Sequence, residues 1–144
     1  MNTAIQIRSA TWKQDRQLLL SVREPVFVIE QKVPAEIEID EHDPLSKHLL
    51  ALSHTGSPIG TARLLPCGQI GRVAVLKAWR RKGIGSALIE HLVKAAIEAQ
   101  FPRVHLHAQV SSIPFYESLG FEPFGQIFDE AGIQHREMQK SLLP

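Results

Sequence analysis

The segment 70–99 constrains the fold more than any other part of the chain, because a strand pattern runs directly into a helix pattern. Residues 70–76 form a short apolar run with two β-branched valines, Val73 and Val75, which is typical of a strand. Across residues 83–99 the apolar side chains recur at spacings of three and four, which predicts an amphipathic helix. Such a helix buries its apolar face against a sheet, so the segment favours a mixed α/β fold.

Further strands and helices are predicted on both sides of this segment. Apolar or alternating runs bounded by turn residues predict strands at residues 5–7, 48–53, 59–65, 104–108, 121–128 and 133–139. Shorter helices are predicted from residue 13 to Pro25, around residues 26–29 with Pro25 in the first turn, and at residues 112–119. The order of these elements predicts a mixed sheet with helices on its faces.

The acidic stretch 34–44 stands out between the first helices and the hairpin. It carries five carboxylates among few apolar residues: Glu36, Glu38, Asp40, Glu41 and Asp43. We expect a loop or a mostly irregular arm. A solvated loop is the first interpretation of its charges, and attraction of a cationic substrate is the alternative.

Length and composition limit the class of protein. The chain has 144 residues, which fits one domain, residues 1–144, with 44% hydrophobic and 22% charged residues. Its formal net charge of +1 gives no global reason to expect a nucleic acid or an anionic membrane as partner. Cys67 is the only cysteine, which excludes an internal disulfide and fits a reducing compartment. Residues 1–12 lack a signal-peptide core and no apolar stretch reaches about 18 residues, so we expect a cytoplasmic protein.

The loop before the long helix has the chemistry of an anion site. Three basic residues, Arg80, Arg81 and Lys82, precede Gly83 and Gly85 at the start of the helix. The first amides of a helix have no internal partner, and glycine lets a phosphate approach them closely. The alternative is a tight turn beside a solvated basic run. No Gly-Lys-Ser/Thr follows, which excludes a Walker loop, and the third glycine of a dinucleotide fingerprint is absent.

Two motifs resemble a known family. Arg80-Arg81-Lys82-Gly83-Ile84-Gly85 resembles the arginine/glutamine–x–x–glycine–x–glycine/alanine signature of the GNAT superfamily of N-acetyltransferases. Further along, Phe115-Tyr116-Glu117-Ser118-Leu119-Gly120-Phe121 resembles the family's second landmark. The stretches 23–34, 106–109 and 131–135 are similar to the small bacterial branch called ElaA/YjcF-like. The resemblance implies a GNAT-like, mostly antiparallel sheet with one splayed parallel pair, residues 70–76 and 104–108, and helices on both faces.

The resemblance also implies acetyl-coenzyme A as co-substrate, held in the gap between the splayed strands. Backbone groups of Val73, Ala74 and Val75 are expected to bind the pantetheine arm and polarise the thioester carbonyl. The amides from Arg81 to Ser86 are expected to hold the pyrophosphate. The residues implied to bind coenzyme are Val73, Ala74, Val75, Arg80, Arg81, Lys82, Gly83, Ile84, Gly85, Ser86 and Gln109. Gln109 replaces the asparagine found in many members, with a longer reach.

The chemistry implied is direct transfer to an amine in a ternary complex, with no acyl-enzyme, no metal and no role for Cys67. Tyr116 is the expected general acid that protonates the departing thiolate. Glu24 is a candidate base, with Glu30, His107 and His135 as further candidates. The residues expected near the acceptor are Arg23, Phe27, Glu30, His107 and His135. Each also has a purely structural interpretation: an exposed helix charge, a core side chain or an edge-strand side chain.

Two other functions compete with this one. A protein of the same fold could hold acyl-coenzyme A as a sensor without catalysis, which the retention of Tyr116 disfavours. A nucleic-acid binder using Arg80–Lys82 is disfavoured by the near-zero net charge and the absence of interleaved aromatics. The sequence identifies neither the amine, a small molecule or a peptide, nor the range of acyl groups. Analogy with the superfamily allows a homodimer.

Overall fold

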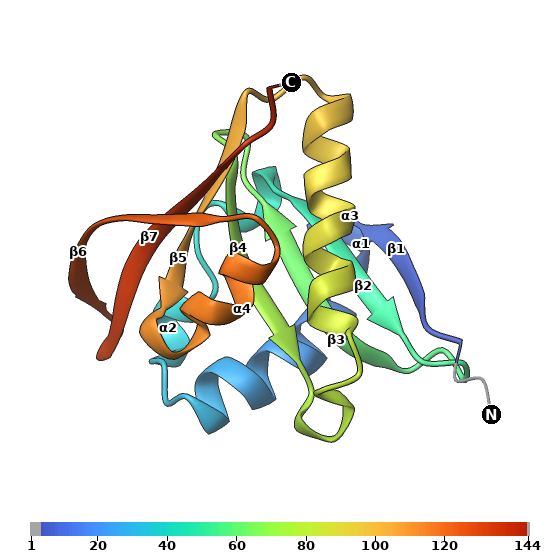
Figure 1. Cartoon of the computed structure of the whole chain (residues 1–144). Helices are drawn as coiled ribbons and strands as arrows, with labels where there is room; N and C mark the ends of the chain where they lie inside the picture. Colours follow the sequence, from blue (N-terminus) through green and yellow to red (C-terminus); the bar gives the residue numbers. More distant parts are fainter. Residues whose placement is uncertain (1–3, 144) are drawn as a thin grey trace.

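The computed structural model describes residues 4–143, so residues 1–3 and 144 of the predicted domain lie outside the described part (Figure 1). The strands are β1 (Gln6–Ala10), β2 (Lys47–Leu52), β3 (Pro58–Leu64), β4 (Gln69–Val75), β5 (Arg103–Gln109), β6 (Glu122–Glu130) and β7 (Ile133–Ser141). The helices are α1 (Trp12–Arg23), α2 (Ala35–Glu38), α3 (Ile84–Glu98) and α4 (Ile113–Ser118), with a π-helical segment (Glu24–Glu30) after α1. Within residues 4–143, no helix has the length and apolarity needed to cross a bilayer.

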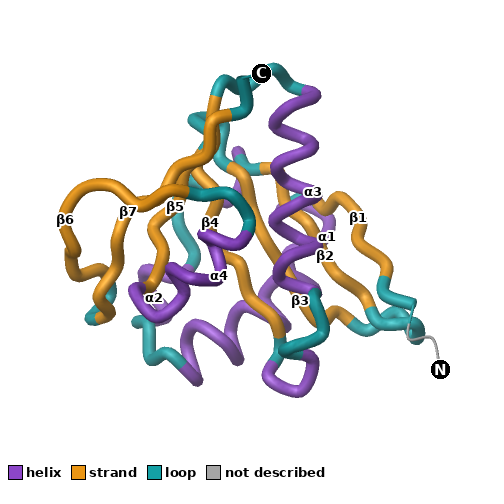
Figure 2. The backbone as a smooth tube through the Cα atoms, in the orientation of Figure 1, coloured by secondary structure: helices purple, strands orange, loops and turns teal. Residues whose placement is uncertain are grey.

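The strands form one sheet in the order β1-β2-β3-β4-β5-β7-β6 (Figures 1 and 2). Among the described strands, β4 and β5 pair in parallel and every other neighbouring pair is antiparallel. The predicted mostly antiparallel sheet with one parallel pair is therefore confirmed. The parallel pair lies in the middle of the sheet and joins a hairpin-rich half, β1–β4, to a second half, β5–β7–β6.

The sheet is covered on both faces because β2 is apolar on both faces. Leu49 and Ala51 pack in the core cluster that includes the buried side of α3, whereas Leu50 packs with Leu19 of α1. Successive residues of a strand point to opposite faces, so α1 and α3 lie on opposite sides of the sheet. Figure 1 shows α3 crossing the near face. The predicted placement of helices on both faces is confirmed.

The two parallel strands diverge soon after they meet. Pairing is limited to Gln69 with His105 and Ile70 with Leu106, after which β4 pairs with β3 alone. The backbone of β4 from Gly71 onward therefore has one side free of a neighbouring strand. This divergence is the splay that the family resemblance predicted.

A bulge in β4 accompanies the divergence. Thr61 pairs with Ala74 and Arg63 pairs with Gly71, so β4 contains one more residue than β3 over this interval. Arg72, inside the bulge, has φ of 49°, which is uncommon for a residue with a side chain. The Thr61 hydroxyl donates to the Arg72 carbonyl at 3.0 Å, so a side chain replaces part of the interrupted ladder.

The helix after residue 13 does not stop at Pro25, as the sequence led us to expect. Glu24 keeps right-handed helical angles, φ −63° and ψ −51°, and α1 passes directly into the π-helical segment. Pro25 has no amide hydrogen to donate, and the wider turn changes the hydrogen-bonding pattern instead of ending the helix. The Gln31 amide donates to the carbonyl of Val26, five residues back, at 3.0 Å. The predicted second helix is thus continuous with the first.

Candidate functional site

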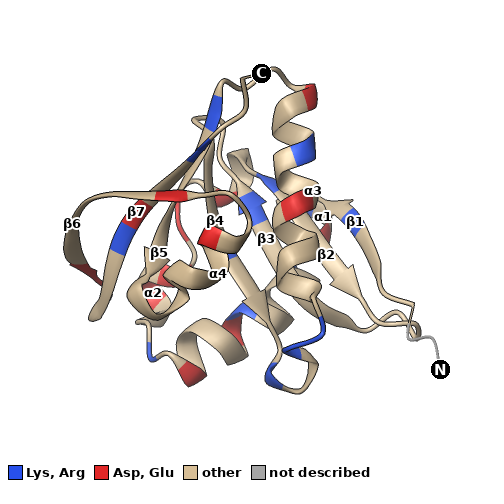
Figure 3. Ribbon diagram, viewed as in Figure 1, with Lys and Arg blue, Asp and Glu red and all other residues tan. Residues whose placement is uncertain are grey.

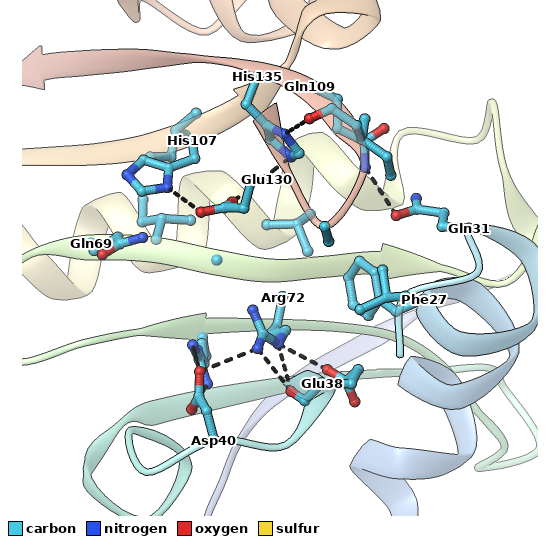
Figure 4. A pocket seen from close by; sticks show the side chains of 18 of the residues that line it. Phe27, Gln31, Glu38, Asp40, Gln69, Arg72, His107, Gln109, Glu130 and His135 are labelled. Atoms are coloured by element: carbon cyan, nitrogen blue, oxygen red, sulfur yellow. Dashed lines mark hydrogen bonds and ion pairs between the residues drawn. The ribbon is translucent and has the colours of Figure 1, made fainter. Parts of the chain in front are cut away.

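Two adjoining cavities lie along the opening between β4 and β5. The larger cavity has a volume of about 400 Å³ and extends toward β7 and the 34–44 stretch; Figure 4 shows it from close by. The smaller cavity has a volume of about 360 Å³ and extends to the beginning of α3. The residues that line both cavities are Gln31, Val73, Ser112 and Tyr116. The two cavities therefore meet beside the splayed strand and α4.

The smaller cavity ends at the amino end of α3. Gly83, which precedes the helix, has φ of 81°, a conformation that favours glycine. Gly83, Ile84, Gly85 and Ser86 all line the cavity. A Cβ atom at Gly85 would lie 3.5 Å from Phe115 Cζ, so the missing side chain leaves open the space between the helix amides and α4. This geometry suits an anion, since the first amides of a helix lack internal partners.

The loop before α3 carries a run of basic residues, drawn in blue in Figure 3, whose surroundings differ. Arg80 and Arg81 line the smaller cavity, whereas Lys82 is exposed and lines neither cavity. Arg80 makes a bidentate ion pair with Glu30 of the π-helical segment, 2.6 Å for each bond, and its Nε donates to the Val75 carbonyl at 2.9 Å. The hydrogen bond from Arg80 lowers the pKa of Glu30. In this structure, therefore, Arg80 is held by a carboxylate.

The strand residues predicted to bind the thioester lie together at the smaller cavity. Val73, Ala74 and Val75 all line it, and this part of β4 pairs with β3 only. Gln109 is placed differently. It lines the larger cavity, and its Nε2 donates to Gln31 Oε1 at 2.9 Å, so its amide is engaged across the cleft (Figure 4).

Tyr116 lies at the junction of the two cavities. It is on α4 and packs edge-on against Phe115 and Phe121, with ring centroids 5.0 and 5.9 Å apart. Burial raises the pKa of Tyr116 to about 12, so the phenol holds its proton throughout the neutral range. A protonated hydroxyl beside both cavities is able to donate to a group that gains negative charge there.

A carboxylate lies between two histidines on the other side of the larger cavity (Figure 4). His107 Nδ1 lies 3.1 Å from Glu130 Oε2, and His135 Nε2 lies 3.9 Å from Glu130 Oε1. The hydrogen bond that His107 donates to the Glu130 carboxylate raises the pKa of His107 and lowers the pKa of Glu130. The Phe128 ring packs against both imidazoles, with its centroid 5.2 Å from that of His107 and 5.9 Å from that of His135.

The acidic stretch 34–44 forms the opposite wall and is not the solvated loop that its charges led us to expect. It contains α2 and a 3₁₀ turn, Asp43–Leu45, and only Glu36 and Glu41 of its carboxylates are exposed. The others pair with three arginines from α1, β3 and β4. This arginine–carboxylate network consists of Arg23, Arg63, Arg72, Glu38, Asp40 and Asp43.

The arginine–carboxylate network is closely hydrogen-bonded, and four of its six members, Arg23, Arg63, Glu38 and Asp43, are buried. Arg23, 1% exposed, bonds Glu38 at 2.8 Å and Asp43 at 2.8 Å. Arg63 bonds Asp40 at 2.7 Å and Asp43 at 2.9 Å. Arg23 was expected to contact a substrate. The structure corrects this expectation, because the buried guanidinium forms ion pairs with Glu38 and Asp43 and is not accessible to a ligand.

The pKa of Asp40 shows how strongly the arginines of the network stabilise the ionised form of a carboxyl group. Burial alone would raise its pKa, but the hydrogen bond and charge of Arg63, with the charge of Arg72, lower it to about 2. The unfolded reference is 3.8, so the ionised carboxylate stabilises the folded state at neutral pH. That contribution is lost as the pH falls from about 3.8 through about 2.

The structure brings some predicted acceptor residues to the larger cavity and leaves others out. Phe27, His107 and His135 line it. Glu30 is paired with Arg80, as described above. Glu24 is exposed and lines neither cavity, so the structure corrects the prediction that it acts as base.

Sequence reasoning missed two functional candidates in this cavity. Glu130 and Arg72 both line it, and the sequence indicated a role for neither. The only signal for Glu130 in the sequence was its place two positions before the glycine of the last turn, and this did not identify His107 as its partner.

Among residues 4–143, no group of three or more His, Cys, Asp or Glu side chains is arranged to hold a metal ion.

Comparisons with known proteins identify the family and the fold. A family profile described as acetyltransferase (GNAT) domain matches residues 22–142. The uncharacterized N-acetyltransferase YjcF of Bacillus subtilis is 38% identical over 123 residues, 83% of this chain and 87% of YjcF. The crystal structure of an acyl-CoA N-acyltransferase from Pseudomonas aeruginosa has a TM-score of 0.86 and 29% identity, covering 96% of this chain and 100% of the other. Escherichia coli ElaA has a TM-score of 0.85 and 27% identity, with coverage of 96% and 100%.

Proposed function

Because the chain belongs to the GNAT acetyltransferase family, we propose that it transfers an acetyl group from acetyl-coenzyme A to a primary amine, with both substrates bound at once. The observation that carries this proposal is the junction of two cavities at Val73 and Tyr116. One cavity has the amides and basic residues suited to a coenzyme, and the other has the acid–base groups suited to an amine. Direct transfer requires such a junction, because the two reacting groups must meet without an enzyme-bound intermediate.

The coenzyme occupies the smaller cavity in this proposal. Its pyrophosphate lies on the amides at the amino end of α3, with Arg81 beside it and Gly85 leaving room for the phosphate oxygens. Its pantetheine arm lies along Val73–Val75, where β4 has no partner strand on the side toward β5. The thioester then reaches the junction of the cavities.

The reaction at the junction follows from the groups there. The amine nitrogen attacks the thioester carbonyl carbon, a C–N bond forms, and the C–S bond breaks. Backbone donors of Val73–Val75 stabilise the developing oxyanion, an effect worth several kcal/mol in acyl transfer. The departing thiolate takes the proton of the Tyr116 hydroxyl, and the phenolate regains a proton from the nitrogen, which loses it as the amide forms.

The proton of the incoming ammonium goes to His107. This imidazole lines the larger cavity, and its pairing with Glu130 raises its pKa, which makes it a stronger proton acceptor. Glu130 orients the ring through Nδ1, 3.1 Å away. Glu24, which lines neither cavity, has no part in the proposed mechanism. No step requires a metal ion.

The test combines binding with turnover. Acetyl-coenzyme A at 100 times its dissociation constant should raise the stability of the folded state by about 2.7 kcal/mol, visible as a higher melting temperature. Release of free thiol, corrected for hydrolysis, should then depend on an added amine. No melting shift at millimolar ligand contradicts the coenzyme site. A melting shift without turnover on a broad amine panel instead supports the sensor alternative.

A further inference from the structure

Glu130 differs from the other carboxylates that line the larger cavity. Glu38 and Asp40 are bound by Arg23, Arg63 and Arg72. Glu130 contacts imidazoles instead, is half exposed at 49%, and has a lowered pKa that keeps it anionic. Among the described residues that line this cavity, it is therefore the carboxylate available to an ammonium group.

Arg72 offers a complementary group on the opposite wall (Figure 4). Its Nε donates to Glu38 Oε2 at 2.8 Å, and its Nη2 donates to the Glu38 carbonyl at 2.8 Å and to Asp40 at 3.2 Å. Within the described part of the chain, Nη1 has no hydrogen-bond partner, and the side chain is 25% exposed. The charge of Arg72 also contributes to the lowered pKa of Glu130, so the two groups interact electrostatically across the cavity.

We propose that the acceptor is an amino acid or an amino-acid amide, whose ammonium binds Glu130 and whose carboxylate or carbonyl oxygen accepts a hydrogen bond from Arg72 Nη1. This inference rests on the proposed acetyl transfer and names its substrate class. A polyamine fits poorly, because its second ammonium would meet guanidinium groups and carboxylates that are already paired. A simple alkylamine leaves Nη1 without an acceptor.

The remaining wall selects an apolar side chain. Phe27, Val33, Ile37 and Ile133 line the same cavity as Glu130 and Arg72. Apolar surface of this kind is covered best by an aliphatic or aromatic group. Leucine and its derivatives are therefore suitable probes.

The decisive experiment compares matched acceptors on the wild-type protein. The four probes are L-leucine, L-leucinamide, 3-methylbutylamine and 1,4-diaminobutane. The carboxylate or amide form should exceed 3-methylbutylamine, which lacks only that group, by about 10- to 100-fold in kcat/KM, the range expected for a hydrogen bond to a charged donor. The better of L-leucine and L-leucinamide shows whether the oxygen is anionic or neutral. The proposal is overturned if 3-methylbutylamine or 1,4-diaminobutane has a kcat/KM equal to or higher than that of the better of L-leucine and L-leucinamide.

Variants assign the two contacts. Glu130→Gln should lower kcat/KM for all amines, while Asp129→Asn, an exposed neighbour on β6, should not. Arg72→Lys should reduce the ratio between L-leucinamide and 3-methylbutylamine, and stabilisation by acetyl-coenzyme A confirms that the variant is folded. An unchanged ratio in a folded Arg72→Lys variant removes Arg72 from acceptor recognition.

Failure of acetyl transfer is distinguishable from failure of this inference. If neither the four probes nor the broad amine panel is acetylated, the proposed reaction is contradicted, and binding of the four probes to the coenzyme A complex is measured by calorimetry. Tighter binding of L-leucinamide or L-leucine than of 3-methylbutylamine then still supports the inferred ligand class. Equal binding of all four overturns it.

Discussion

Arginine side chains serve opposite purposes in two regions of this molecule. In the arginine–carboxylate network, Arg23 and Arg63 are buried and bonded to carboxylates on several sides. In the loop before α3, Arg81 is exposed at the edge of a cavity, and Arg80 has one carboxylate partner, Glu30. Burial with several carboxylate partners makes an arginine part of the scaffold, whereas exposure leaves its charge available to a ligand. The comparison teaches that residue type alone does not assign a role.

The largest expected effect is on stability, from breaking the buried region. Asp43, which is fully buried, accepts from Arg23 at 2.8 Å and from Arg63 at 2.9 Å. Asp43→Asn leaves uncompensated buried charge, and the expected loss is about 3–5 kcal/mol in the free energy of unfolding. Denaturant titration measures it. Glu41→Gln, an exposed carboxylate in the same stretch, is the control, and equal losses for the two variants contradict the scaffold role.

The next effect is on coenzyme binding and concerns the open region. Gly85→Glu places a carboxylate at the amino end of α3, where the pyrophosphate is proposed to bind. It should abolish the stabilisation of about 2.7 kcal/mol expected from acetyl-coenzyme A at 100 times its dissociation constant. Gly85→Ala is the control, because its Cβ meets Phe115 at an ordinary 3.5 Å and should leave part of the stabilisation. Melting temperatures of both variants with and without acetyl-coenzyme A measure the stabilisation, and equal stabilisation of Gly85→Glu and the wild type would show that the pyrophosphate binds elsewhere.

A smaller effect is expected at the junction of the two cavities. Tyr116→Phe keeps the ring packed against Phe115 and Phe121 but removes the proposed proton donor. We expect kcat to fall by about 100-fold or somewhat less, near the lower end for general acid catalysis, with acetyl-coenzyme A affinity changed by a few-fold at most. Steady-state kinetics measures kcat, and a direct binding measurement gives the affinity for acetyl-coenzyme A. A wild-type kcat, when chemistry limits the rate, excludes Tyr116 as the acid.

The smallest expected effect is on coenzyme affinity, from releasing Arg80 of the loop from its ion pair with Glu30. Glu30→Gln removes the carboxylate paired with Arg80 at 2.6 Å and should strengthen acetyl-coenzyme A binding by up to about fivefold, as expected for an exposed ion pair. Glu24→Gln, from the same π-helical segment, should leave affinity and turnover unchanged. Weaker binding in Glu30→Gln would instead show that the ion pair holds Arg80 in place for the phosphates.

What the sequence could predict depended on how local the interaction was. The strand, the basic loop and α3 were predicted well, because the glycines and the helical repeat lie within one segment. The splayed pair and the sheet class came from the family resemblance. The network was missed, because its bonded partners are 15 to 34 positions apart, as in Arg23–Glu38 and Arg72–Glu38. A run of carboxylates looks the same in sequence whether it is solvated or buried against arginines.

The acceptor side was predicted less completely for a related reason. His107 and His135 were identified as candidates, but their shared partner Glu130 was not. Its position depends on β6, whose register against β7 shifts between Phe124 and Phe128, so that counting residues does not show which side chains face the cavity. The π-helical continuation through Pro25 was also missed, because proline predicts a stop unless the turn widens.

The short seam between β4 and β5 has a mechanical consequence. Two halves of the sheet are joined there by only two residue pairs, Gln69 with His105 and Ile70 with Leu106. A small change in the angle between the halves strains few hydrogen bonds, so the gap is the most compliant part of the sheet. We therefore expect a ligand that bonds the free edge of β4 and contacts the opposite half to reduce this motion, and to affect the spacing of the walls in both cavities.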